Sequence, residues 1–134
     1  MATIFSRIIS GELPCHRLAE NDAFLAFLDI RPISIGHALV IPKREEDRFF
    51  DLPEKLLSEI LVFAKPIALA IESIIPCNRV GLMVAGLEVP HAHLHLVPIR
   101  DINDLSFENA SPGKPEQLEA LALNIRQVLA NGDV

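Results

Sequence analysis

The sequence predicts an α+β fold in which helices pack on an antiparallel sheet of about five strands. Short apolar segments separated by turn residues are typical of adjacent antiparallel strands. Two longer segments, one central and one C-terminal, instead have apolar residues at helical spacing. A length of 134 residues with 50% hydrophobic residues suits one domain with a sizeable core. We therefore expect residues 1–134 to form a single domain.

The first third of the chain predicts one short helix followed by three strands. Thr3 is a possible N-cap for a helix that Gly11 would end. Asn21 and Asp22 form a typical tight-turn pair between the first two strands. The expected strands are His16–Glu20, Ala23–Asp29 and His37–Pro42.

The rest of the chain predicts a long helix, two strands and a C-terminal helix. Asp51, with Glu54 three positions later, is typical of a helix start. That helix is expected to extend to Ile75, with a disturbance at Pro66. Pro98–Gly113 is polar and expected to be irregular. The remaining expected elements are strands over Arg79–Val84 and Val89–Val97, around a turn at Ala85–Gly86, and a helix over residues 115–131.

Charge and cysteine content exclude several classes of partner. The net charge of −6 disfavours long nucleic acids and anionic membranes as main partners, although it allows a small anion in a local pocket. Residues 1–9 are too short and polar for a signal-peptide core, and no stretch indicates a membrane span. Cys15 and Cys77 form no Cys-x-x-Cys pair. The sequence therefore favours a cytoplasmic, reduced protein.

Three of the five histidines are His91, His93 and His95. On a strand these alternate residues would project from one face. A single histidine in such a place is usually structural, but three clustered titratable groups indicate a functional site. A zinc site is a less favoured alternative, since no cysteine is near in sequence and the three rings would span too far to converge on one ion. Nucleophilic catalysis fits better, because neutral imidazole is available near pH 7 and can attack phosphorus.

The histidine cluster is one of four segments that together resemble the histidine triad (HIT) family. HAHLHL at His91–Leu96 is similar to its His-x-His-x-His signature. The other three are IFSRIISGELP at Ile4–Pro14, FLAFLDIRP at Phe24–Pro32 and GHALVIPK at Gly36–Lys43. The resemblance covers residues 4–99 in order and leaves a C-terminal extension with the helix near 115–131.

This resemblance implies a homodimer with an antiparallel sheet that binds purine nucleotides and cleaves at the α-phosphorus. By position, it implies that His93 is the nucleophile and that His95 contacts phosphate oxygens. It places His91 and His37 in the hydrogen-bond network around the nucleophile. Asp29 would bind the ribose hydroxyls, although on sequence alone it could equally end a strand or cap a turn. The implied base pocket consists of Ile4, Phe5, Ile8, Phe27 and Ile30.

Two departures from the family pattern bear on metal and phosphate binding. Many bacterial members hold a structural zinc with Cys-x-x-Cys and a histidine; here Thr3 and Ser6 replace the cysteines and Glu45–Glu46 replaces the histidine region. We therefore expect no metal and no cofactor. The phosphate loop, usually Gly-Gln-Ser/Thr-Val, becomes Gly86-Leu87-Glu88-Val89. Removal of one oxyanion donor lowers the rate by about 100–1000-fold. The loss of the neutral donors therefore bears directly on turnover.

The sequence thus predicts a nucleotide-binding hydrolase or transferase acting through a covalent nucleotidyl-histidine intermediate. The substrate would be a nucleoside phosphoramidate or a dinucleotide. Leu87 and Glu88 motivate an alternative from another class, a nucleotide-binding or interaction module with little turnover. A histidine-based metal site is the third hypothesis.

Overall fold

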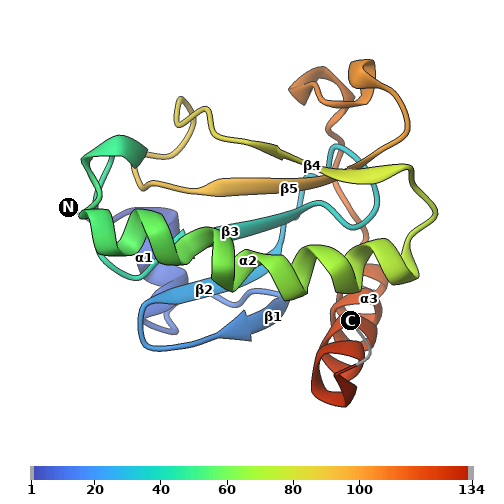
Figure 1. The fold of residues 1–134 in the computed structure, drawn as a ribbon, viewed down its shortest axis with the longest axis horizontal. Helices are drawn as coiled ribbons and strands as arrows, with labels where there is room; N and C mark the ends of the chain where they lie inside the picture. The colour runs from blue at the N-terminus through green and yellow to red at the C-terminus, as the bar shows by residue number, and fades with distance from the viewer. Residues whose placement is uncertain (1, 133–134) are drawn as a thin grey trace.

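The computed structural model describes residues 2–132 and has one five-stranded antiparallel sheet with helices on both faces (Figure 1). The strand order is β1-β2-β3-β5-β4, and every neighbouring pair is antiparallel. The elements in chain order are α1 (Ile4–Ile9), β1 (Arg17–Glu20), β2 (Phe24–Leu28), β3 (Ala38–Pro42), η1 (Phe49–Asp51), α2 (Glu54–Ile74), β4 (Arg79–Met83), β5 (Leu94–Ile99), η2 (Ile102–Asp104), η3 (Phe107–Asn109) and α3 (Pro115–Asn131). The predicted α+β class and strand number are confirmed.

The sheet separates two apolar clusters, since successive strand residues point to opposite faces. The larger cluster joins alternate residues of β2, β3 and β5 to α2 and α3. Figure 1 shows α2 lying along one face, with α1 behind the strands on the other. On that second face Phe5 of α1 packs with Phe27 and Leu39. Among the described residues, no helix is both long and apolar enough to cross a membrane.

Helix α2 begins later than the sequence predicts, and the expected Asp51 cap is wrong. Asp51 ends η1, whereas the N-cap of α2 is Pro53, which forms no side-chain cap. Pro66 lies inside the helix, as expected. Both Pro66 and Val62 are exposed, so water can solvate the Val62 carbonyl that a proline at position 66 leaves without its helical donor.

The predicted strand over Val89–Val97 is wrong at both ends, since β5 comprises Leu94–Ile99. Pro90 lacks the N–H that a ladder needs. After it, the His91 N–H donates to the Val89 carbonyl at 2.8 Å and the Ala92 N–H donates to the Glu46 carbonyl at 2.6 Å. The preceding strand likewise ends at Met83 rather than Val84. Of the three clustered histidines, His95 alone therefore lies on a strand.

Candidate active site

Four histidines lie buried together on the α1 side of the sheet. The exposed fractions of His37, His91, His93 and His95 are only 1–4%. The Phe5 ring meets the His93 ring edge-on, with centroids 5.1 Å apart, and the His93 and His95 centroids are 4.9 Å apart. Leu94 and Leu96 enter the opposite, α2-side core. The predicted alternation of the side chains is thus present, although His91 and His93 precede the strand.

Hydrogen bonding fixes the tautomer of His93. Its Nδ1 lies 2.6 Å from the His91 carbonyl oxygen, which can only accept, so Nδ1 carries the proton. In a neutral ring the lone pair then resides on Nε2. In a regular strand the His91 carbonyl would point to a neighbouring strand. In the bend before β5 it points instead to the His93 ring. The irregular backbone therefore produces the orientation of the lone pair.

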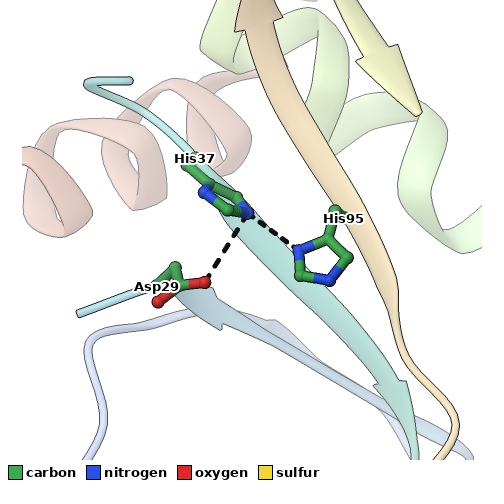
Figure 2. A group of neighbouring side chains, drawn as sticks. All are labelled: Asp29, His37 and His95. Carbon is green, nitrogen blue, oxygen red and sulfur yellow. Dashed lines mark hydrogen bonds and ion pairs between the residues drawn. The ribbon is translucent and has the colours of Figure 1, made fainter. Parts of the chain in front are cut away.

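A second chain of hydrogen bonds fixes His37 and His95 (Figure 2). The Ile33 N–H donates to His37 Nδ1 at 2.9 Å, so His37 carries its proton on Nε2. That Nε2 lies 2.9 Å from His95 Nδ1 and 3.6 Å from Asp29 Oδ2. His95 Nδ1 therefore accepts, and its Nε2 carries the proton. This buried N–H has no hydrogen-bond partner within residues 2–132.

Gly36 places His37 directly before β3, so the predicted strand start at His37 is one residue too early. The Gly36 φ of +97° is a conformation that favours glycine, and a Cβ there would lie 3.0 Å from Ile75 Cγ1 and 3.1 Å from Pro98 Cγ. The glycine thus lets the chain turn tightly under α2 before β3 begins.

His91 completes the histidine group from the other side. Its Nε2 lies 2.8 Å from the Pro42 carbonyl oxygen and donates to it. This leaves Nδ1 as an acceptor, which is buried and has no partner in the described part of the chain. His91 therefore anchors the bend to β3 and positions the carbonyl that holds His93.

Burial keeps two of these rings neutral. It lowers the pKa of His37 to about 4, and burial, with the neighbouring His37 and His93, lowers the pKa of His95 to about 3. Burial also raises the pKa of Asp29, against smaller opposing effects of the Arg31 N–H, His93 and the Arg31 side chain. At neutral pH the His37–His95 chain is thus a pair of neutral imidazoles whose tautomers are fixed.

All six residues implied for nucleotide binding line one cavity of about 270 Å³. Asp29 stands at its rim beside Ile30, and the other walls are apolar. Sequence reasoning missed the other lining residues, which are Leu28, Leu39 and, from the segment after α1, Leu13, Pro14 and Cys15. The residues implied by the family were Ile4, Phe5, Ile8, Phe27, Asp29 and Ile30.

A second, smaller cavity of about 120 Å³ adjoins the histidines. His93 and His95 form one wall, and Leu87 and Glu88 of the phosphate loop form another. Phe107 of η3 also lines it, with its ring centroid 5.2 Å from that of His95. Sequence reasoning missed Phe107, which lies in the segment expected to be irregular; an aromatic residue among polar neighbours was the available signal. Val89 does not line this cavity but packs beside the Phe5 cluster.

One group of described residues lies close enough together for a metal site, and it differs from the cluster of His91, His93 and His95. Asp29, His37 and His95 each offer a ligand atom, and these atoms lie within 4.8 Å of one another (Figure 2). In the present arrangement the two imidazoles instead satisfy each other through a hydrogen bond. A metal would have to displace the His37 Nε2 proton.

The HIT domain model matches residues 10–102, which include the histidine cluster and most of the sheet. The chain belongs to the HIT family. This HIT protein is 40% identical over 102 residues to an adenosine 5′-monophosphoramidase of Schizosaccharomyces pombe, covering 73% of this chain and 74% of that one. It is 38% identical over 104 residues to the enzyme of the same name from Saccharomyces cerevisiae, covering 75% of this chain and 64% of that one.

Solved structures resemble the HIT protein over nearly its whole length. A zinc-bound histidine triad family protein from Mycobacterium smegmatis has a TM-score of 0.83 and 32% identity, covering 99% of this chain and 96% of that one. A hypothetical histidine triad nucleotide-binding protein from Sulfolobus tokodaii also has a TM-score of 0.83, with 29% identity, covering 95% and 91%. Helix α3 follows the matched family segment and packs against α2 and β1.

Proposed function

We propose that this protein hydrolyses purine nucleotide derivatives at the α-phosphorus through a covalent nucleotidyl-His93 intermediate. One observation carries the proposal: the Nδ1–H of His93 is bonded to a carbonyl, which leaves the Nε2 lone pair for attack. The similarity to two adenosine 5′-monophosphoramidases supports phosphoramidates as substrates. The cavities support binding of a nucleotide, because Phe5 lines the apolar cavity and its ring contacts His93, which lines the histidine cavity.

The nucleotide would lie across the two cavities. The base would occupy the apolar pocket between Phe5 and Phe27, where flat aromatic and aliphatic walls favour a purine. Asp29, at the rim, would accept hydrogen bonds from the ribose hydroxyls. The α-phosphoryl group would then reach His93 and His95.

In the first step Nε2 of His93 attacks the α-phosphorus, so the Nε2–P bond forms while the P–N bond to the amine breaks. The leaving nitrogen takes up one proton from solvent. The Nε2–H of His95 donates to a phosphoryl oxygen as negative charge develops there. The His91 carbonyl stabilises the positive charge on the nucleotidylated ring through Nδ1–H.

In the second step water attacks the same phosphorus and the Nε2–P bond breaks. The water releases one proton to solvent, which balances the proton taken up before. The products are the nucleoside monophosphate, the amine and free His93.

The test is steady-state hydrolysis of adenosine 5′-phosphoramidate by the native protein and by His93→Ala. We expect the variant to lose activity by at least about 1000-fold, the scale on which removing a covalent nucleophile acts. Equal rates in the two proteins would eliminate the mechanism.

A second candidate is a nucleotide-binding module with little turnover. It is favoured by the phosphate loop, where Leu87 is 92% exposed and Glu88 places a negative charge beside the histidine cavity. Tight binding of AMP in calorimetry, with no product from the phosphoramidate, would favour this function over hydrolysis. Stoichiometric zinc in elemental analysis, lost on mutation of His37, would favour a metal role for the Asp29–His37–His95 group.

We also propose a cytoplasmic homodimer. One of the two edge strands of the sheet is β4, which exposes Leu82, and α2 exposes Leu61 and Val62. An unpaired edge strand with apolar neighbours is suited to association with a second copy. A monomeric mass by light scattering would contradict the dimer.

A further inference from the structure

Two segments that line the apolar cavity are in contact with the C-terminal part of the chain. Residues 13–15 line it between α1 and β1, and Asp29 and Ile30 line it directly after β2. Beyond η3, the Gly113 N–H donates to the Ile30 carbonyl at 2.9 Å. The chain then continues into α3, which packs against β1 (Figure 1). A segment that follows the matched family residues therefore reaches the surroundings of this cavity.

Helix α3 is a fixed support for its neighbours. Leu118, Ala122 and Ile125 on one face belong to the larger apolar cluster, with exposed fractions of 0–8%. Apolar packing therefore sets the position of the helix, and its polar side chains are not needed for that purpose. A polar side chain of α3 can consequently hold an adjacent segment in place.

Arg126 of α3 contacts the strand that follows the cavity wall. Its Nη1 donates to the Arg17 carbonyl at 2.6 Å, and its Nη2 donates to Glu119 Oε2 at 3.1 Å. Glu119 Oε1 also lies 2.9 Å from His16 Nδ1. The Arg126 side chain is only 26% exposed, so solvent screens its contacts less than those of a fully exposed ion pair.

Strand β1 gives the cavity wall little support of its own. It has four residues, lies at an edge of the sheet, and its register with β2 shifts between Arg17 and Ala19. Pro14, within the wall, has no N–H to donate. The bond from Arg126 therefore holds the chain at the irregular point of the strand, two residues after the cavity-lining Cys15.

Resting on the proposed function, in which this cavity holds the base, we propose that Arg126 is a positioning residue for nucleotide binding. It fixes the 13–15 wall against the bound base, and Glu119 orients its guanidinium. Neither side chain lines the cavity, so both act through the wall. The base is held alike in the ground state and the transition state, so Arg126 acts on KM and leaves kcat unchanged.

The first arm of the test measures the affinity for AMP by titration calorimetry. Arg126→Ala should weaken binding about three- to fivefold, the upper range for loss of one partly exposed ionic contact. Glu119→Ala should weaken binding less, and Glu119→Gln, which keeps an acceptor for Arg126, should restore most of the affinity. The matched control is Glu116→Ala, which removes another exposed carboxylate from α3 and should leave the affinity unchanged.

The same variants separate positioning from a general loss of structure in the hydrolysis of adenosine 5′-phosphoramidate. Arg126→Ala should raise KM by the factor found for AMP, with kcat unchanged. Unchanged AMP affinity in Arg126→Ala, or a lower kcat at an unchanged KM, would overturn the proposal.

The second arm observes the wall itself, without turnover. Cys15 lines the apolar cavity and Cys77 lines a different one, and both are partly buried. In Arg126→Ala, iodoacetamide should alkylate Cys15 about three- to fivefold faster relative to Cys77, and AMP should protect Cys15 less than in the native protein. A general loss of stability would expose both thiols. An unchanged ratio of the two rates would mean that Arg126 does not hold the wall.

The failures of the two proposals are distinguishable. If Arg126→Ala weakens AMP binding and exposes Cys15 but the native protein hydrolyses no phosphoramidate, the hydrolysis is wrong and the positioning stands. If the native protein hydrolyses the phosphoramidate and Arg126→Ala behaves like it in both arms, the positioning is wrong and the hydrolysis stands. If AMP neither binds to the native protein nor protects Cys15, the base pocket and this inference both fail.

Discussion

Two buried neutral histidines make the stability of this protein depend on pH. His37 and His95 have pKa values lowered to about 4 and about 3 in the folded state, against about 6.5 for a histidine in the unfolded chain. Between these values the unfolded state binds protons that the folded state does not, so the free energy of unfolding decreases as pH falls through about 6.5. The stabilisation is present above pH 6.5 and is lost progressively toward the folded pKa values.

The magnitude follows from the same values. Between pH 7 and pH 5, each ring costs about 2 kcal/mol of unfolding free energy, so the pair costs roughly 4 kcal/mol. Asp29 acts in the opposite direction, because a raised carboxyl pKa makes the folded state bind its proton more readily as pH falls. A loss of this size is a large part of the roughly 5–15 kcal/mol that stabilises typical proteins.

Urea unfolding at pH 7 and pH 5 measures this difference directly, and His37→Gln is the informative variant. Glutamine does not titrate, so the variant should lose about 2 kcal/mol less than the native protein on acidification. His16→Gln is a control, because His16 is partly exposed and bonded to Glu119 on the surface. Identical pH dependence in the native protein and His37→Gln would refute the reasoning.

Two further predictions concern the backbone and the ribose. Gly36→Ala should destabilise the protein by about 1–3 kcal/mol in thermal unfolding, because φ is +97° and the new methyl group would meet Ile75 and Pro98; Gly11→Ala, with φ of +86° but open space around it, should cost less. Asp29→Asn should raise KM for adenosine 5′-phosphoramidate about tenfold and largely remove discrimination against the 2′,3′-dideoxy analogue, measured by initial rates. A variant that keeps full discrimination would contradict ribose binding by Asp29.

Much of the fold could be predicted from local patterns. The turn at Asn21–Asp22 joins β1 and β2 as expected, and Pro115 begins α3. The beginning of β5 could not be predicted from alternation, because period two persists in the side chains from His91 to His95 while Pro90 interrupts the ladder. Alternation in the sequence indicates the direction of the side chains. Whether the backbone forms a ladder depends on its hydrogen bonds to the neighbouring strands.

Four histidines and Asp29 of the candidate site could be named from the sequence, but their tautomers could not. The positions of His37 and Asp29 came from resemblance, and the distances between them and His95 depend on how β2, β3 and β5 align. No local pattern indicates that the Ile33 N–H or the His91 carbonyl sets the proton positions. Phe107 was missed for a similar reason, because its contact with His95 joins two segments through tertiary packing.

The most direct test of the covalent mechanism is the intact mass of the protein during turnover. The native protein, mixed with adenosine 5′-phosphoramidate and quenched rapidly at alkaline pH, should carry one adenylyl group that peptide mapping locates on His93. The adduct should be absent in His93→Ala and present in His16→Ala, which removes a histidine whose side chain bonds to Glu119 and is not in the lining of either cavity. Product formation by the native protein with no adduct on His93, or an adduct that persists in His93→Ala, would contradict the mechanism.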